Sequence, residues 1–404
     1  MTEVRTLLGQ KDQQHRKAVR EEEPESFAER LERHRNKKKR RIIIALIICL
    51  IVLASIYTYN RLKKYQRYVV TNEVQLDSKY NSYFVKFGDN VLKYSNDGAE
   101  YIDSKGEVWN QAFEIQNPLI ETCGKYAAIA DQNSNDVYIF STDKPQGKIT
   151  MTYPIKKLKI ASQGVVGAIL EDKDASYIEL RDKNGEVLTT GKSVISGEGY
   201  PIDFAMSEDG KKMAVSYLCI NDGKIQSRLL FYNFDEVGKG EVDNMVGGFN
   251  YDEGTIIPKV EFINNDTAVA YGDNQINIYT MKEKPQKIWE HQFESEIKQV
   301  FYSTNNFGVV YYNSKDEKPY NAVVYDLKGT RKMDYSYDKE FENVFIDQDS
   351  LVFYNQNQAQ VVTFSGKVKY SGKFSDNIIE MVSTNKKYQY LVVLDNKVQE
   401  IKLK

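Results

Sequence analysis

The sequence predicts an all-β protein: an eight-bladed β-propeller, with seven blades as the alternative count, anchored by one N-terminal transmembrane helix. Three observations support this prediction. An uncharged apolar run lies near the N-terminus, at 42–59. Short segments rich in β-branched and aromatic residues then recur about every 40 residues, which is the period of propeller blades. A paired spacing of large side chains marks the last strand of most of these repeats.

These observations divide the chain into four parts. We expect a basic cytoplasmic leader, partly disordered, over 1–41 and the transmembrane helix over 42–60. A juxtamembrane segment with a closing strand follows over 61–82, and the propeller occupies 83–404. Within the leader, 24–40 is predicted as a polar helix that continues into the membrane helix, because Pro24 suits the first turn of a helix.

The apolar run Ile42–Tyr59 has the length of a membrane-spanning helix. Its eighteen residues rise about 27 Å, which spans a hydrocarbon core of about 30 Å when the flanking side chains snorkel. Seven basic residues lie between Arg33 and Arg41, and four lie between Arg61 and Arg67. This asymmetry predicts a single-pass protein of the cell membrane with a cytoplasmic N-terminus and an extracellular propeller. A cleavable signal peptide is the competing interpretation, but the leader is too long and no A-x-A site follows.

The composition excludes several classes of protein. The formal net charge is -2, whereas nucleic-acid-binding domains usually carry a strong basic excess, so no nucleic-acid partner is expected. We expect the basic residues of the leader to interact with the lipid bilayer instead. Of three cysteines, only Cys123 and Cys219 follow the helix, which argues against a disulfide scaffold and for two buried free thiols. The 29 tyrosines favour strands.

The propeller prediction rests on eight hairpins, each made of the second and third strands of one repeat. In the first hairpin, NVLKYS (90–95) and AEYIDS (99–104) flank the turn dipeptide Asp97-Gly98. The eight hairpins begin at residues 90, 126, 164, 213, 267, 307, 350 and 388. They are spread over 83–403, or about 40 residues per unit.

The last strand of a repeat carries the paired spacing. Trp109 is followed four residues later by Phe113, and Trp289 is followed by Phe293. The same spacing joins Ile149 to Tyr153, Met333 to Tyr337, and Tyr370 to Phe374. Because residues four apart in a strand share a face, we expect each pair to pack against the neighbouring blade.

The two ends of the chain predict how the ring closes. The last repeat stops after its third strand, at Lys404, and one unassigned β-like stretch at 68–76 precedes the first repeat. A propeller in which the two ends of the chain pair within one blade has no open seam. We therefore expect 68–76 to complete the eighth blade.

Two resemblances accompany these patterns. NVLKYSNDGAEYIDSKGEVW (90–109) resembles the repeat of quinoprotein-like (PQQ-like) propellers, in which a Gly turn joins two strands and a Gly-x-x-Trp outer strand follows. From residue 37 onward, the chain resembles more closely a family of uncharacterised single-pass membrane proteins of clostridia-like Gram-positive bacteria. The stretches LKYSNDGAEYIDSKGEVWNQ, MAVSYL and VGGFNYDEGTIIPKVEFINNDTAVAYGDN carry that second resemblance. It implies the fold and the location, and no activity comes with it.

Residues suited to catalysis are scarce in the sequence. His291 is the one histidine that follows the helix, so the common His-based metal sets cannot be assembled there. No G-x-S-x-G or Walker-type motif is present, and Asp131–Asp136 lacks the Gly and Glu of an EF-hand loop. We therefore expect neither an enzyme nor a cofactor. An unrecognised envelope enzyme, including a quinoprotein-like redox enzyme, stays open as an alternative.

The candidate binding site lies in the longest break in the repeat. Two stretches depart from it, Lys192–Pro201 and Phe234–Pro258, and the second is rich in Gly and acidic residues. Long loops on a rigid frame are where binding usually resides. Apolar and acidic residues mix in this loop as they do in protein-binding patches. The predicted partner-binding residues are Met245, Phe249, Tyr251, Asp252 and Glu253, with the two rings as exposed anchors.

These features together predict an extracytoplasmic propeller that acts as a protein-binding scaffold or sensor in the bacterial cell envelope. Its partners would be the lipid bilayer and one or more envelope proteins. A tolerated insertion is an equally good interpretation of the loop. A glycan- or cell-wall-binding propeller that uses surface tyrosines is the alternative function.

Overall fold

A computed structural model describes residues 27–76, 82–194, 197 and 199–404. The chain forms two compact units, one that ends at Lys63 and one that runs over Lys64–Lys404. In the first unit, helix α2 (Phe27–Leu62) is continuous through the polar and apolar segments, as predicted. The predicted helix start at Pro24 and the expected disorder of the leader before it lie outside the described residues. Over Leu31–Tyr59 this helix is long and apolar enough to cross a membrane, a test that a membrane anchor and a signal sequence both pass.

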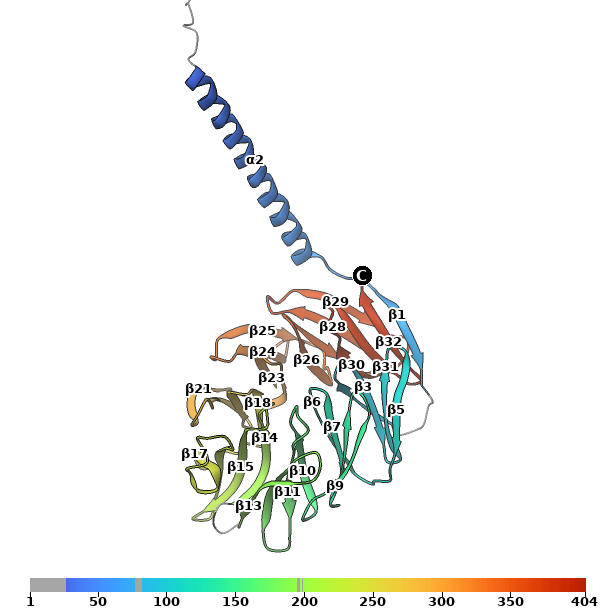
Figure 1. The fold of residues 1–404 in the computed structure, drawn as a ribbon, viewed down its shortest axis with the longest axis vertical. Helices are drawn as coiled ribbons and strands as arrows, with labels where there is room; N and C mark the ends of the chain where they lie inside the picture. Colours follow the sequence, from blue (N-terminus) through green and yellow to red (C-terminus); the bar gives the residue numbers. More distant parts are fainter. Residues whose placement is uncertain (1–26, 77–81, 195–196, 198) are drawn as a thin grey trace, which may run out of the picture. The chain divides into compact units, whose positions relative to one another are not determined.

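The second unit is an eight-bladed propeller, so the seven-bladed alternative is wrong. Eight four-stranded antiparallel sheets follow one another around a ring (Figure 1). The first blade consists of β2 (Tyr83–Phe87), β3 (Asn90–Ser95), β4 (Gly98–Asp103) and β5 (Gly106–Ala112). The second consists of β6 (Pro118–Cys123), β7 (Tyr126–Asp131), β8 (Asp136–Ser141) and β9 (Pro145–Thr150). The third consists of β10 (Ile155–Ile160), β11 (Val166–Glu171), β12 (Ser176–Arg181) and β13 (Val187–Ser193).

The next four blades repeat this order. The fourth consists of β14 (Tyr200–Met206), β15 (Lys212–Asn221), β16 (Lys224–Asn233) and β17 (Met245–Asn250), with the short 3-10 helix η1 (Val242–Asn244) before β17. The fifth consists of β18 (Lys259–Asn264), β19 (Thr267–Tyr271), β20 (Gln275–Thr280) and β21 (Gln286–Gln292). The sixth consists of β22 (Ile297–Tyr302), β23 (Asn306–Tyr312), β24 (Tyr320–Asp326) and β25 (Arg331–Tyr337). The seventh consists of β26 (Asn343–Asp347), β27 (Ser350–Tyr354), β28 (Gln358–Thr363) and β29 (Val368–Lys373).

The eighth blade closes the ring as predicted. It contains β30 (Ile378–Ser383), β31 (Gln389–Leu394), β32 (Lys397–Leu403) and β1 (Tyr68–Gln75), which pairs antiparallel with β32 from Tyr68↔Leu403 to Gln75↔Lys397. Tyr68 also stacks on Phe374 of the seventh blade, with ring centroids 4.6 Å apart. Both ends of the propeller sequence therefore meet in one sheet.

Strand directions define two faces of the propeller. Strands alternate in direction within each sheet, so β1 begins at the face where the innermost strands end. We call this the proximal face; it carries the turns between first and second strands, such as 303–305 and 384–388. The distal face carries the turns between second and third strands, such as 222–223.

The paired side chains of the outer strands pack between blades as expected. The Trp109 ring lies parallel to Phe140 of the second blade at a centroid distance of 5.2 Å. Its Nε1 also donates a hydrogen bond to the carbonyl oxygen of Ser141 at 3.1 Å. Trp289 contacts Tyr325 of the sixth blade at a centroid distance of 4.9 Å, with the two rings tilted by 51°. Aromatic contacts thus stabilise the packing of these outer strands against the neighbouring blades.

A β-bulge in each outer strand is a feature that the spacing did not reveal. In the first blade, Tyr101 pairs with Trp109 but Ile102 pairs with Glu107, so Val108 is the extra residue. The outer strands β9, β13, β17, β21, β25 and β29 shift register at the corresponding place. The bulge precedes Trp109, so the four-residue spacing that follows still keeps Trp109 and Phe113 on one face.

Candidate functional site

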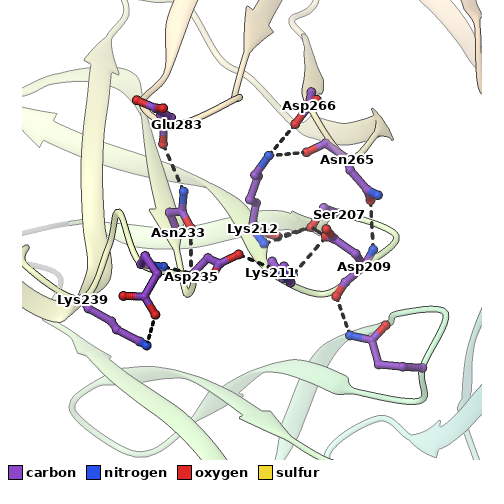
Figure 2. A network of polar contacts seen from close by, with 12 residues as sticks. Ser207, Asp209, Lys211, Lys212, Asn233, Asp235, Lys239, Asn265, Asp266 and Glu283 are labelled. Atoms are coloured by element: carbon purple, nitrogen blue, oxygen red, sulfur yellow. Dashed lines mark hydrogen bonds and ion pairs between the residues drawn. The ribbon is translucent and has the colours of Figure 1, made fainter.

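The loop predicted to bind a partner does not exist as one exposed segment. Its middle forms η1 and β17, the outer strand of the fourth blade. Its first part is held by polar contacts at the proximal face (Figure 2). Lys211 pairs with Asp235 at 2.8 Å, and the amide of Asn233 donates to the carbonyl oxygen of Glu283 in the fifth blade at 3.2 Å. The segment Phe234–Pro258 therefore supplies the outer strand of the fourth blade and is not an exposed binding loop.

The same network joins the fourth blade to its neighbours. The Nζ atom of Lys212 donates to Asp266 at 2.6 Å and to the carbonyl oxygen of Asn265 at 2.9 Å (Figure 2). The backbone nitrogen of Asp209 donates to the side chain of Asn265 at 3.0 Å. Gln163 of the third blade donates to the carbonyl oxygen of Asp209 at 2.5 Å. Three consecutive blades are thus tied together at the proximal face by groups that satisfy one another.

The two rings predicted as exposed anchors lie instead in packing between blades. Phe249 is half-buried, with its ring centroid 4.8 Å from that of Tyr279 and 6.1 Å from that of Phe231. The hydroxyl of Tyr251 forms a 2.6 Å hydrogen bond with that of Tyr279. Burial, and then the neighbouring Tyr279, raises the pKa of Tyr251. The physical reason for the difference is Tyr279, a residue of the fifth blade. It is too distant in the sequence for a prediction from local patterns to place it against these two rings.

The other three predicted residues are exposed but do not form one patch. Met245 begins β17 and is 40% exposed. Asp252 and Glu253 follow the opposite end of that strand, at the distal face. A six-residue strand is about 20 Å long, so Met245 is well separated from the two acids. Whether any of the five binds a partner stays a prediction.

Asp252 and Glu253 lie beside the most unusual element of the propeller, the β15–β16 hairpin. Each of its strands has ten residues, whereas the second and third strands of the other blades have five to seven. Its turn is the dipeptide Asp222-Gly223, with φ of 50° and 79°. Two positive φ values suit the two-residue turn that matches the twist of a hairpin. The extra residues extend the hairpin beyond the strands beside it at the distal face.

The end of this hairpin, residues 219–226, presents apolar side chains to solvent. Ile220 and Ile225 are cross-strand partners, and they are 66% and 46% exposed. Lys224 pairs with Glu253 at 2.5 Å, and the backbone nitrogen of Gly254 donates to the carbonyl oxygen of Ile225 at 2.9 Å. We call 219–226 with 252–254 the hairpin tip. It is an apolar pair with charged neighbours, which is the usual composition of a protein-binding patch.

The sequence contained a signal for the hairpin tip. The β-rich pattern continues past MAVSYL through Cys219 and Ile220, and it resumes at Ile225 directly after the turn. In the other blades the pattern stops sooner. Comparison of hairpin lengths between repeats would have identified the fourth blade as the exception.

A second candidate site is a charged cluster in the central channel. Lys159 on β10 lies between Glu121 on β6, at 3.2 Å, and Glu261 on β18, at 3.1 Å. Lys259 also pairs with Glu261 at 2.6 Å, and the carboxylate of Asp203 accepts a hydrogen bond from the backbone nitrogen of Val260 at 2.9 Å. Four innermost strands supply this cluster. Its charges are paired within the protein, which suits a structural role.

The pKa values in the cluster move as these contacts require. Burial raises the pKa of Glu121 and of Asp203 because it disfavours a charged carboxylate. Glu261 is buried as well, but Lys159 and Lys259 hold its pKa below the ordinary value. The surrounding carboxylates raise the pKa of Lys159 in turn, against the effect of burial. The pKa shifts of Lys159 and Glu261 therefore both favour the charged forms of that ion pair.

The other side of the channel holds a cavity of about 910 Å³. It reaches the proximal face, and its lining includes Lys86, Asp347, Glu380 and the turns 303–306 and 383–385. The Nζ atom of Lys86 donates to Ser383 at 3.0 Å, and the hydroxyls of Tyr354 and Tyr390 donate to Glu380 and Asp347. The volume falls within the range of ligand pockets.

The remaining residues singled out in the sequence have structural surroundings. His291 on β21 contacts the rings of Trp289 and Phe293, and burial lowers its pKa. Cys123 and Cys219 lie on β6 and β15; Cys219 is buried as predicted, whereas Cys123 is only partly buried. Asp131–Asp136 spans the turn between β7 and β8, as a plain hairpin loop should. Within the described ranges, no group of three His, Cys, Asp or Glu side chains is arranged to hold a metal ion.

The tyrosines are mostly part of strand packing. Among the described residues after Lys64, three tyrosines count as exposed: Tyr83, Tyr302 and Tyr312, at 53%, 43% and 38%. Tyr302 faces the channel cavity, and Tyr83 stacks on Tyr94 at 5.5 Å. The propeller therefore shows few of the surface rings that a tyrosine-based glycan site needs.

Solved structures share the fold at low sequence identity. BamB from Moraxella catarrhalis matches with a TM-score of 0.53 and 10% identity, over 83% of this chain and 100% of that chain. Sqt1 from Chaetomium thermophilum matches with a TM-score of 0.53 and 10% identity, over 85% of this chain and 97% of that chain. The same protein, solved bound to the N-terminus of the ribosomal protein L10, gives a TM-score of 0.51. These similarities support the propeller fold and no more.

Sequence comparison places the chain in a family. No curated protein matches it significantly. A family model, however, matches 61–403, which is the whole propeller together with the segment that closes it. The PQQ-like subtype and the clostridial origin stay predictions. The chain belongs to the family of unknown function DUF5711.

Proposed function

We propose that the protein is a membrane-anchored, non-catalytic scaffold of the bacterial cell envelope, which binds another protein through the hairpin tip. In this proposal α2 is the anchor and the propeller is extracellular. The observation that carries the proposal is the length of β15 and β16, whose ends expose the paired Ile220 and Ile225. Closing a blade does not require these extra residues, because the other blades close with shorter hairpins.

Exposure of two β-branched aliphatic side chains at a hairpin end is unfavourable for a free protein. Each isoleucine would gain roughly 1.5–3 kcal/mol on full burial against a partner, and less for the part already covered. The edge of a two-stranded ribbon also offers backbone groups for pairing with an added strand. Asp252 and Glu253 provide charges at the rim. These features suit a protein partner better than a sugar, which aromatic platforms and hydrogen-bonding side chains would recognise.

The residues of the channel are better suited to a structural role than to catalysis. Two of its poorly exposed charges, on Lys159 and Glu261, pair with each other. The Sqt1 complex with the N-terminus of ribosomal protein L10 is a case in which this fold serves as a frame for protein binding. We extend that role, and nothing of its partner, to this chain.

The proposal is tested by co-purification of the tagged full chain from its own membranes. An Ile220→Ser, Ile225→Ser variant should lose a specific co-purifying protein and keep the unfolding midpoint of the parent. The matched control is Val187→Ser, Leu188→Ser, because these residues of β13 are 52% and 54% exposed at an outer strand. Loss of the partner from both variants, or from neither, would contradict a specific role for the tip.

A further inference from the structure

The proximal face carries basic side chains gathered where the chain enters the propeller. The backbone nitrogen of Tyr65 donates to the carbonyl oxygen of Lys369 at 2.7 Å, and Tyr65 also contacts Tyr388 at a centroid distance of 5.1 Å. Lys64 therefore adjoins the seventh and eighth blades. The backbone of Arg67 exchanges hydrogen bonds with Lys404, of 3.2 and 2.8 Å.

Five exposed basic residues surround this point, and we call them the basic patch: Lys64, Arg67, Lys367, Lys386 and Lys387. Lys369, which is only 4% exposed, lies beneath them. Burial lowers the pKa of Lys369, and the positive charge of Lys387 and of Lys367 lowers it further. Asp349 pairs with Lys387 at 2.8 Å and offsets part of the charge. The patch therefore keeps a clear positive excess although the whole chain is slightly acidic.

We propose that the basic patch binds the anionic phospholipid headgroups of the membrane that α2 crosses. Five residues, 63–67, separate the end of α2 at Leu62 from the start of β1 at Tyr68. A chain of that length spans roughly 20 Å when fully extended. The covalent link thus keeps Lys64 and Arg67 within reach of the headgroups. Clustered Lys and Arg side chains next to a transmembrane helix are attracted to anionic lipid.

This inference rests on the proposed role of α2 as a membrane anchor, and it does not depend on a protein partner. It gives a function to the basic residues that follow the helix. The larger number of basic residues before the helix predicts its orientation, but it does not explain why basic residues also follow the helix. Contact of the proximal face with lipid would also leave the distal face, with the hairpin tip, free for other molecules.

Lysine footprinting of the full chain in lipid nanodiscs tests the inference. We would compare nanodiscs of phosphatidylcholine with nanodiscs that also contain phosphatidylglycerol, using an uncharged amine reagent and mass spectrometry. Modification of Lys367, Lys386 and Lys387 should slow at least about threefold with anionic lipid, and added salt should reverse the effect. Lys173 and Lys224 on the distal face serve as internal controls and should react equally in both nanodiscs.

A variant separates lipid contact from a general effect of the membrane. In Lys367→Gln, Lys386→Gln, the protection of Lys387 by anionic lipid should disappear, whereas Lys173→Gln, Lys224→Gln should retain it. Equal modification rates in the two nanodiscs would overturn the proposal. The same slowing at Lys173 and Lys224 as at the patch would also overturn it.

Discussion

Replacement of Lys159 by methionine should destabilise the propeller through the channel. The change keeps most of the side-chain volume and removes the one cation that Glu121 and Glu261 share, at 3.2 and 3.1 Å. The side chains of Lys159 and Glu261 are only 12% and 8% exposed, so the carboxylate left behind lies in a poorly solvated site. Loss of one partner of a buried pair costs about 3–5 kcal/mol. Lys259 still pairs with Glu261, so we expect about 3 kcal/mol, the lower end of that range.

Urea unfolding of the full chain in detergent, followed by the fluorescence of Trp109 and Trp289, measures this free energy. The control is Lys148→Met, which removes an ion pair with Asp136 at the surface and should leave the midpoint nearly unchanged. A loss below about 1 kcal/mol for Lys159→Met would refute a buried, stabilising pair.

The dependence of this loss on pH provides a second check. Glu261 has a lowered pKa, so its contribution to stability is present above 4.5, its ordinary value, and disappears as the pH falls through the folded-state value. Lys159 has a raised pKa, so its contribution is complete below 10.5 and disappears as the pH rises past that value. Without the lysine, acidification lets the carboxylates take up protons and removes their repulsion. The stability gap between parent and variant should therefore narrow from pH 7 to pH 5, and a gap that widens would refute the reasoning.

Three further predictions address closure, a thiol and topology. Tyr68→Ala removes the stack on Phe374 and should lower the free energy of unfolding by about 2 kcal/mol; an unchanged urea midpoint would mean that β1 does not close the ring. Burial, and then the charge of Glu208, raises the pKa of Cys123 to about 11, so its alkylation should be slow at pH 8 and accelerate toward pH 11; rapid alkylation at pH 8 would contradict that environment. Lys105→Cys, in a chain without its native cysteines, should react with a membrane-impermeant thiol reagent in intact cells; labelling only after lysis would reverse the topology.

The fold could be predicted from the sequence because its signals are local and repeat. Turn dipeptides such as Asp97-Gly98 and the spacing from Trp109 to Phe113 each lie within one blade, and eight copies reinforce one another. Closure of the ring could also be predicted, because the last repeat has no fourth strand of its own and an unassigned β-like stretch at 68–76 precedes the first repeat. The bulges in the outer strands left no comparable signal.

The candidate site was harder to predict because its residues meet only after the ring forms. In the sequence, Phe249 and Tyr251 have the surroundings of exposed loop residues. Only their contacts with Tyr279 of the next blade show that both rings are packed between blades. Glu121 and Glu261 approach Lys159 from strands far apart in the sequence. Contacts between side chains of different blades form only when the ring closes, so no short segment of the sequence predicts them.

The central claim is that this propeller meets a protein partner through the tip of its fourth blade. A photo-crosslinking amino acid placed at Ile225 of the full chain, irradiated in native membranes, tests that claim directly. We expect one discrete crosslinked protein from Ile225 and none from Leu188 on β13, which is at least as exposed. No adduct from Ile225, or the same adducts from both positions, would contradict it.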